Sequence, residues 1–446
     1  MPILRGLTMN TNQLIENYKQ EMLNTLARLV AIPSVSTNPD GDAPFGKNCR
    51  LALERFLDIA KSLGFETANY DNYAGSAQLG KGKAELGILG HLDVVPVTEE
   101  DWATPPFTMT IKDGKAFGRG TIDDKGPTVA ALFAMKAVND AGLLKKPVRL
   151  IVGCSEETGS ELDIEHYTKC AEMPPMVFTP DAEFPLINCE KGMIRGEFAK
   201  AFSDETLVSL TAGTVVNAVP SKAIAVVKGI DEDKLPKIPQ LTAEKKGDLL
   251  TLTCTGKAAH ASTPTEGENA LTMLIEILCG LGIEPMRQLS QIFKHNECTV
   301  ETAKGGLLTY VFSVADYSDN KFTGKFDIRY PVGSEKEHIF EEITKAFRKL
   351  DYEVSFPTSS NPHYVDENSR FVQTLLKVYS EETGLKAECQ TCGGGTYVHE
   401  IEGGVAFGPE FPGENSNLHS ADEFISIDNF IKCAKIYARA IEELCG

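Results

Sequence analysis

Three short apolar runs in the sequence each lead directly into acidic or histidine residues. The runs cover residues 86–89, 148–152 and 176–178, and each has the length and composition of a buried strand. Amphipathic helical stripes cover residues 14–30, 53–63 and 128–141. Strands that alternate with helices predict an α/β fold, with a mixed, largely parallel sheet flanked by helices.

The middle of the chain follows a different pattern. Polar and apolar residues alternate from residue 189 to residue 362, with helical stripes near 269–279 and 335–350, which is typical of an α+β domain. A helix, strand and helix pattern returns between residues 371 and 444. We therefore expect one α/β domain made of residues 1–188 and 363–446, interrupted by an inserted α+β domain of residues 189–362.

Charged side chains and one histidine lie where the predicted strands end. These residues are His91 and Asp93, Glu156 and Glu157, and Asp181 and Glu183; a further pair, Asp123 and Asp124, precedes the helix at 128–141. Ligands of open α/β sheets bind at the carboxyl ends of the strands, so we expect these groups to converge. Clustered carboxylates must either take up protons or be neutralised by metal. Histidine combined with carboxylate suits Zn²⁺ best, with Mn²⁺ or Co²⁺ as alternatives.

Composition and missing motifs exclude several other functions. Lys plus Arg number 44 against 63 Asp plus Glu, and a formal charge of -19 argues against binding to nucleic acid. The sequence has no apolar stretch long enough to span a membrane, no signal-peptide pattern in its first twelve residues, and neither an H-E-x-x-H nor a G-x-S-x-G motif. Eleven scattered cysteines, among them the C-x-x-C pair Cys389 and Cys392, predict buried thiols in a reducing cytoplasm.

Five ordered motifs make the chain resemble the M20 family of co-catalytic metallopeptidases. They are GHLD at 90–93, GRGTIDDKG at 118–126, SEETG at 155–159, PDA at 180–182 and HSADE at 419–423. Together with DWATPPF at 101–107 and GGGTY at 393–397, they look most similar to the bacterial PepV-type dipeptidases. The resemblance implies a catalytic α/β domain that carries two divalent metal ions, with the inserted domain as a lid.

The resemblance also implies roles for individual residues of the catalytic domain. The metal ligands would be His91 and Asp181 for one ion, Glu157 and His419 for the other, and Asp123 bridging both. Asp93 would orient the imidazole of His91, as metal-bound histidines commonly require. Glu156 would be the general base toward a metal-bound hydroxide.

Further roles fall on the lid and on the GGGTY loop. His260 would donate a hydrogen bond to the developing oxyanion. The residues implied in substrate binding are Asn217, Arg329, Gly394, Gly395 and Thr396. Arginine can pair with a planar carboxylate through two parallel hydrogen bonds, and glycine lets the backbone approach a substrate closely. His166, His295, His338 and His363 match no motif and are expected to be ordinary surface or core residues.

The leading hypothesis is a monomeric, dimetal-dependent dipeptidase that acts on small peptides. The first alternative is an amidohydrolase of N-acyl amino acids, of the deacylase or succinyl-diaminopimelate desuccinylase type, because the same metal centre can serve any amide. The second alternative is a non-catalytic amino-acid or metal-binding protein. Such a protein would be expected to lose its base first, and Glu156 is present.

Overall fold

The computed structural model describes residues 9–160, 162–293, 297–302 and 306–446, with the backbone alone at 291 and 297–302. His295 and the first eight residues lie outside the described part, so the expectations placed on them are not addressed. The chain divides into two compact units. The first unit comprises Met1–Asn188, Tyr364–Gln390 and Thr396–Gly446, and the second comprises Cys189–His363 and Thr391–Gly395.

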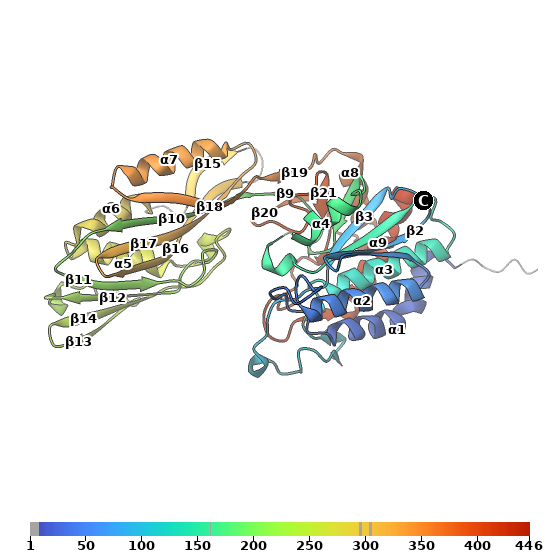
Figure 1. Ribbon diagram of the computed structural model, residues 1–446, viewed down its shortest axis with the longest axis horizontal. Coiled ribbons are helices and arrows are strands. Elements are labelled where there is room, and N and C mark those ends of the chain that lie inside the picture. The colour runs from blue at the N-terminus through green and yellow to red at the C-terminus, as the bar shows by residue number, and fades with distance from the viewer. Residues whose placement is uncertain (1–8, 161, 294–296, 303–305) are drawn as a thin grey trace, which may run out of the picture. The chain divides into compact units, whose positions relative to one another are not determined.

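A nine-stranded mixed sheet forms the centre of the first unit (Figure 1). Its strands are β1 (Glu66–Tyr70), β2 (Ala74–Leu79), β3 (Leu86–His91), β6 (Val148–Gly153), β7 (Met176–Thr179), β9 (Leu186–Glu190), β19 (His363–Tyr364), β20 (Cys389–Cys392) and β21 (Gly404–Ala406). The order is β1-β2-β6-β3-β7-β21-β9-β19, with β20 paired to β9. The inner strands β6, β3, β7 and β21 run parallel, whereas β1 and β2 are antiparallel, which confirms the predicted α/β class.

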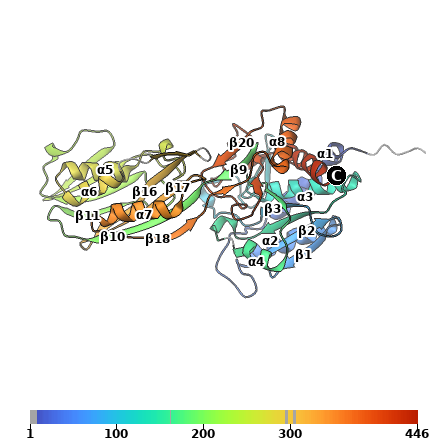
Figure 2. The same ribbon diagram turned by 90° about the horizontal axis from the view of Figure 1, so that it is seen from above.

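Helices cover both faces of this sheet (Figure 2). They are α1 (Thr11–Val30), α2 (Lys47–Ser62), α3 (Lys125–Asp140), α4 (Leu162–Cys170), α8 (Arg370–Thr383) and α9 (Ile427–Cys445). Neighbouring strand residues point to opposite faces: Ile88 packs in the core with α1, α3 and α9, while Leu89 packs with Tyr167 of α4. The strand–helix alternation in the sequence thus produces a three-layer unit.

Two small sheets shape the loops around the strand ends. β4 (Thr110–Lys112), β5 (Lys115–Phe117) and β23 (Phe424–Ser426) form one, and β8 (Ala182–Glu183) pairs with β22 (Pro409–Glu410) in the other. The pairing of β23 with β5 places the loop that precedes β23 beside the loop that follows β5.

The second unit is an antiparallel sheet with helices, as the alternating sequence pattern predicts. Its strands are β10 (Gly192–Ala201), β11 (Leu207–Ala212), β12 (Lys222–Lys228), β13 (Leu241–Lys246), β14 (Leu249–Thr255), β15 (Glu297–Thr302), β16 (Gly306–Ser318), β17 (Lys321–Tyr330) and β18 (Glu353–Ser360). Its helices are α5 (Ala270–Gly280), α6 (Glu284–Ile292) and α7 (Lys336–Arg348). A cluster of aromatic rings that includes Phe198, Phe326 and Phe347 forms its core. None of the described helices is both long and apolar enough to cross a membrane.

Candidate active site

The predicted metal ligands of the first unit meet at one edge of its central sheet. His91 is the last residue of β3, Glu157 lies in the turn after β6, and Asp181 lies two residues beyond β7. These three strands are parallel neighbours, so their carboxyl ends lie together. Asp123 comes from the loop before α3, and His419 from the loop before β23.

The side chains form two groups that share Asp123. His91 Nε2 lies 2.9 Å from Asp123 Oδ1 and 3.5 Å from Asp181 Oδ2. On the other side, His419 Nε2 lies 2.8 Å from Asp123 Oδ2 and 3.2 Å from Glu157 Oε2. Within each group the candidate ligand atoms lie within 4.8 Å of one another, so each group is compact enough to hold one metal ion.

Asp93 connects the first strand end to the turn after the second. The ring nitrogen Nδ1 of His91 lies 3.1 Å from the backbone oxygen of Asp93 and 3.4 Å from its Oδ1. The two carboxylate oxygens of Asp93 accept the backbone N–H groups of Glu156 and Glu157, at 3.3 Å and 3.1 Å. Asp93 is fully buried and therefore fixes both the imidazole and the glutamate pair.

Crowded carboxylates dominate the electrostatics of the site. Burial and the charges of Asp181 and Asp123 raise the pKa of Glu156 well above its usual range. Burial would lower the pKa of His91, yet Asp181 and Asp123 raise it well above its ordinary value. Contacts with Asp123 and Glu157 raise the pKa of His419 to about 10. The protonated histidines thus supply the positive charge that the acids require, which is the charge that bound cations would supply.

The donor atoms fit divalent metal ions. His91 Nε2 is buried, faces two carboxylates and forms no hydrogen bond of acceptable geometry, as expected of a nitrogen oriented to bind a cation. The two groups offer imidazole nitrogen and carboxylate oxygen and no thiolate. This donor set suits Zn²⁺, Mn²⁺ or Co²⁺. Glu156 belongs to neither group, and Glu183 is exposed at the end of β8.

Sequence reasoning missed a buried clamp beside the metal ligands. Glu423 accepts hydrogen bonds from Arg119 Nη1 at 2.5 Å and from the backbone N–H groups of Gly120 and Ile122 at 3.1 Å and 2.9 Å. Arg119 Nη2 also donates to the backbone oxygen of Ser420. The clamp therefore joins the loop of Asp123 to the loop of His419. Both residues stand inside quoted motifs, GRGTIDDKG and HSADE, but the sequence does not show that they pair.

A second missed pair supports the turn that carries the glutamates. Asp163 is fully buried and accepts the backbone N–H groups of Cys154 and Ser155, at 2.7 Å and 2.8 Å, together with the hydroxyl of Tyr397 at 2.5 Å. A Cβ atom on Gly153 would lie 1.6 Å from the Tyr397 hydroxyl and 2.3 Å from Asp163 Oδ2. Only glycine allows the end of β6 to approach this pair.

In the second unit, Arg329 and His260 lie in one neighbourhood with the start of the glycine loop. Arg329 lies on β17 and donates to both oxygens of Asp327, from Nε at 2.6 Å and from Nη2 at 3.2 Å, while Nη1 donates to the backbone oxygen of Gly393 at 3.4 Å. A Cβ atom on Gly393 would lie 2.4 Å from the Cβ of Ser262, which contacts His260. Asp327, which the sequence did not single out, therefore orients the guanidinium of Arg329 from one side.

His260 is exposed, and its surroundings define its tautomer. The backbone N–H of Ser262 donates to His260 Nδ1 at 3.3 Å, so the proton of the neutral ring resides on Nε2. Neighbouring atoms desolvate part of the ring, and this desolvation and the charge of Arg329 lower the pKa of His260, which keeps the ring neutral. Asn217 lies alongside, because its backbone oxygen accepts the N–H of Ala261 at 2.9 Å.

The remaining predicted residues are in the loop after β20. Gly394 donates its backbone N–H toward Cys392 Sγ at 3.4 Å, and the backbone oxygen of Thr396 accepts the N–H of His399 at 2.9 Å. Gly394 and Gly395 group with the second unit, and Thr396 with the first.

Comparisons with known proteins identify the family of this chain. Residues 87–443 match the model of peptidase family M20/M25/M40. The protein YtjP of Bacillus subtilis (strain 168) is 35% identical over 96% of this chain and 97% of its own length. The Beta-Ala-Xaa dipeptidase of Lactobacillus delbrueckii subsp. lactis is 33% identical over 98% of this chain and 99% of its own length.

Solved structures share the fold at lower sequence identity. Human carnosine dipeptidase 1 superposes with a TM-score of 0.62 at 18% identity, and the alignment covers 98% of both chains. The dipeptidase Dug1p of Saccharomyces cerevisiae superposes with a TM-score of 0.61 at 15% identity, again over 98% of both chains. The family match and the full-length relatives show that this chain belongs to the M20/M25/M40 peptidases and is a hydrolytic metallopeptidase.

Proposed function

We propose that this chain is a dipeptidase that uses two divalent cations and a glutamate base. The observation that carries the proposal is the Asp123 carboxylate, whose two oxygens face two separate groups of donors. A carboxylate shared in this way is the arrangement that two neighbouring cations require, since each ion needs its own donors and the pair needs a common one.

Five residues of the first unit would hold the cations. They are His91 and Asp181 on one side, Glu157 and His419 on the other, and Asp123 between them. When bound, the two ions polarise the scissile carbonyl and lower the pKa of water. Zn²⁺ is the first candidate, and Mn²⁺ and Co²⁺ accept the same donors.

Glu156 is the proposed base, because it adjoins the centre without belonging to either group of ligands. Its carboxylate takes a proton from the attacking water and returns it to the nitrogen of the leaving amine. The amide C–N bond breaks, and one water is added across it. Asp93 acts on this step indirectly, since it holds the backbone of both Glu156 and Glu157.

The second unit would supply groups that bind the substrate. His260 can donate from Nε2 to the developing charge on the carbonyl oxygen, because its Nδ1 is already an acceptor. Arg329 would bind the substrate carboxylate through its guanidinium, which Asp327 keeps in place. We assign backbone or amide contacts with the substrate to Asn217, Gly394, Gly395 and Thr396.

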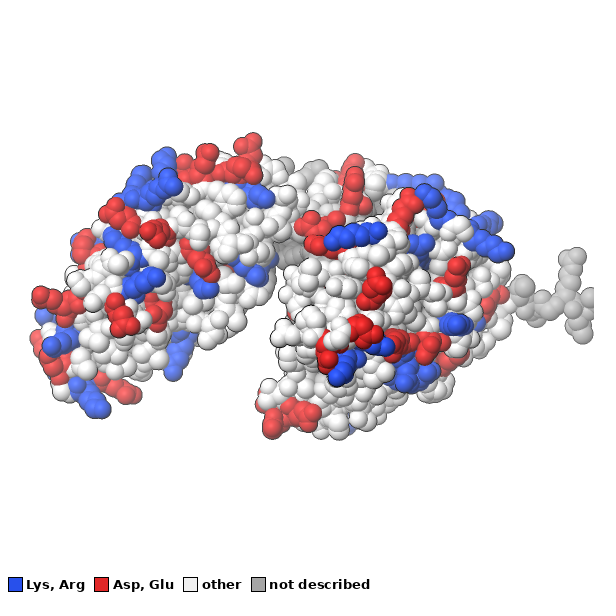
Figure 3. All heavy atoms as spheres, viewed as in Figure 1, with Lys and Arg blue, Asp and Glu red and all other residues white. Residues whose placement is uncertain are grey.

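Dipeptides are the proposed substrate class, supported by the name of the Lactobacillus relative and its near-complete overlap with this chain. On the face in view in Figure 3, acidic and basic side chains are interspersed over both units, which suits a small substrate better than a polyanion. We further propose a monomer, which sedimentation would show as one species of 48.5 kDa. A reducing cytoplasm is proposed because the eleven cysteines are scattered along a large chain, unlike the regular cysteine framework of a secreted protein.

The proposal is tested by amine release from metal-stripped protein reconstituted with Zn²⁺ or Mn²⁺. The substrate panel holds dipeptides, including one that begins with β-alanine, tripeptides, and N-acyl and N-succinyl amino acids. We expect metal-dependent turnover of the dipeptides. Preferred cleavage of the acylated compounds would replace the dipeptidase with a deacylase, and a protein that binds metal but cleaves nothing would refute both enzymes.

A further inference from the structure

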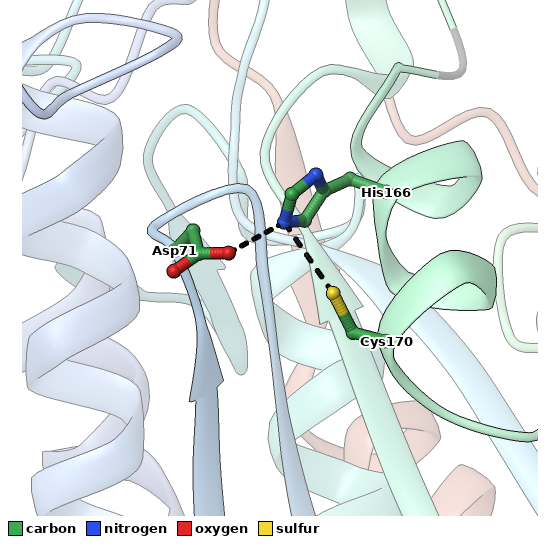
Figure 4. Close-up of side chains that lie close together, drawn as sticks. All are labelled: Asp71, His166 and Cys170. Atoms are coloured by element: carbon green, nitrogen blue, oxygen red, sulfur yellow. Dashed lines mark hydrogen bonds and ion pairs between the residues drawn. The ribbon is translucent and has the colours of Figure 1, made fainter.

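Three side chains of the first unit converge at a point that the proposed peptidase chemistry does not use. His166 Nε2 lies 2.9 Å from Asp71 Oδ2 and 3.6 Å from Cys170 Sγ (Figure 4). The three ligand atoms all lie within 4.8 Å of one another. Asp71 and Cys170 are exposed, so a solvated ion can reach the cluster.

Two elements of fixed geometry bring these residues together. His166 and Cys170 are four residues apart on α4, so their side chains lie on the same face of the helix. Asp71 lies in the three-residue turn, 71–73, between β1 and β2, where it has φ 52° and Asn72 has φ 62°. This conformation suits glycine best and is tolerated by Asp and Asn. The turn therefore places a carboxylate where glycine would fit the backbone at lower cost.

An aromatic ring also packs against the imidazole of His166. The ring of Tyr73 stacks on the ring of His166, with centroids 4.2 Å apart and an angle of 16° between the planes. Tyr73 belongs to the same turn, and its backbone N–H donates to the oxygen of Tyr70 at 3.0 Å. One hairpin thus supplies both the carboxylate and the surface that orients the histidine.

The pattern of contacts differs from that of an activated nucleophile. In a Cys–His–Asp relay the acid binds one ring nitrogen and the thiol binds the other, so that the histidine can pass a proton. Here Asp71 and Cys170 both approach Nε2. Three ligand atoms within 4.8 Å of one another are close enough to share one cation.

We propose that Asp71, His166 and Cys170 form a peripheral binding site for a thiophilic divalent cation of the zinc class. A tetrahedral Zn²⁺ with ordinary bond lengths would place its nitrogen and oxygen ligands ~3.3 Å apart and its nitrogen and sulfur ligands ~3.5 Å apart. The observed separations of 2.9 Å and 3.6 Å need only small adjustments to reach these values.

The chemistry of the donors selects the ion. One thiolate and one carboxylate balance the charge of a divalent cation, and water can complete the coordination at an exposed site. Thiolate excludes Mg²⁺ and Ca²⁺ as preferred occupants. The bound ion would join the β1–β2 hairpin to α4, the helix whose first turn carries Asp163. The inference goes beyond the proposed peptidase function and does not depend on it.

Titration of the metal-stripped full chain with Co²⁺ tests the site. Thiolate bound to Co²⁺ gives a charge-transfer absorption band in the near ultraviolet, whereas the nitrogen and oxygen donors of the proposed catalytic centre do not. We expect the wild-type protein to show this band, Zn²⁺ to abolish it by displacement, and Cys170→Ser and His166→Ala to lack it. Cys389→Ser is the matched control and should keep the band.

A second readout follows Cys170 directly. Saturating Zn²⁺ should slow alkylation of Cys170 by iodoacetamide at least roughly tenfold, measured by peptide mass spectrometry, because a metal-bound thiolate is no longer free to react. Reconstituted Cys170→Ser should cleave the peptide panel at the wild-type rate, which separates this site from the catalytic one. A band that survives in Cys170→Ser, or alkylation of Cys170 that Zn²⁺ does not slow, would overturn the proposal.

Discussion

At the scale of single residues, we propose different roles for the neighbours Glu156, the base, and Glu157, a metal ligand. The carboxylate of Glu157 contacts His419, whereas the backbone N–H of Glu156 donates to Asp93. Replacement by glutamine keeps the size and removes the proton acceptor. We expect Glu156→Gln to lower kcat by about 10²–10⁴-fold.

Metal content is the companion measurement for this variant. Because Glu156 belongs to neither ligand group, Glu156→Gln should bind as much metal as the wild type, measured by elemental analysis. Glu165→Gln, an exposed change on α4, is the matched control and should leave kcat unchanged. Wild-type turnover by Glu156→Gln would remove the assignment of the base.

We expect Asp163 and Tyr397 to affect the reaction through the backbone they hold. Asp163 binds the N–H groups of Cys154 and Ser155, immediately before the glutamate pair. We expect Tyr397→Phe and Asp163→Asn to lower kcat about 10- to 100-fold with a smaller change in KM, because supporting contacts of a metal site have effects of this size. Steady-state kinetics well below the melting temperature measures this split.

A purely structural role of Tyr397 would lower the stability of Tyr397→Phe without lowering its kcat. Removing the hydroxyl leaves a buried acceptor with one partner fewer, which costs about 1–3 kcal/mol of unfolding free energy. Tyr352→Phe is the matched control, since that hydroxyl is buried without a hydrogen-bond partner among the described residues. If Tyr397→Phe loses stability but keeps its kcat, the pair is structural and does not position the glutamates.

Site residues could be predicted from the sequence where they stand in a local motif, and could not where their partners are distant in the chain. His91, Glu157 and Asp181 follow apolar strands and stand in recognisable motifs, and the structure brings them together as the pattern indicates. Asp327 and Asp163 are single acids whose partners are defined only by folding. Asp163, for example, lies 234 residues from Tyr397. His166 looked ordinary in the sequence because its companion Asp71 is 95 residues away.

At the scale of elements, the clamp of Glu423 and Arg119 joins two loops that each carry a proposed metal ligand. Its hydrogen bonds fix the backbone at Gly120 and Ile122, just before Asp123. Glu423→Gln keeps the size but weakens its charge-assisted bond with Arg119. We expect metal affinity to fall about 10- to 100-fold, measured by competition with a chromophoric chelator.

The control for the clamp is Glu402→Gln, an exposed change that makes none of these contacts. Far-ultraviolet circular dichroism should show that Glu423→Gln keeps its secondary structure. If Glu423→Gln binds metal as tightly as Glu402→Gln, the two loops do not need the clamp to hold their ligands.

Elements were predictable where burial gives them a pattern. The apolar runs became β3, β6 and β7, and the stripe at 128–141 became α3, which begins earlier, at Lys125. β1 was missed because it is partly exposed and reads ETANY, with no apolar run. The three-residue strands β4, β5 and β23 were missed because pairing of distant segments, rather than local composition, creates them.

At the scale of the whole molecule, the charge of the metal centre couples metal binding to stability and pH. In the metal-free chain the pKa of His419 is raised to about 10 by Asp123 and Glu157. A histidine with a higher pKa in the folded state stabilises the fold fully below about pH 6.5, its unfolded value, and this contribution is lost as the pH rises through the folded value. Burial raises the pKa of Glu156 and Asp181, and a carboxyl group with a raised pKa also favours folding less as the pH rises.

Chelation should therefore destabilise the protein, and more strongly at alkaline than at mildly acidic pH. We expect the melting temperature of the metal-free chain to fall between about pH 6 and about pH 10. The Zn²⁺-loaded chain should lose less, because its histidines bind the metal as neutral ligands and the cations keep the carboxylates ionised. Calorimetry of both forms across this range measures the difference.

His338→Asn, a change at an exposed histidine of the second unit, should leave both curves unchanged. If the melting temperature of the metal-free chain stays constant or rises with pH, the pKa values of these histidines and carboxyl groups are not raised by folding.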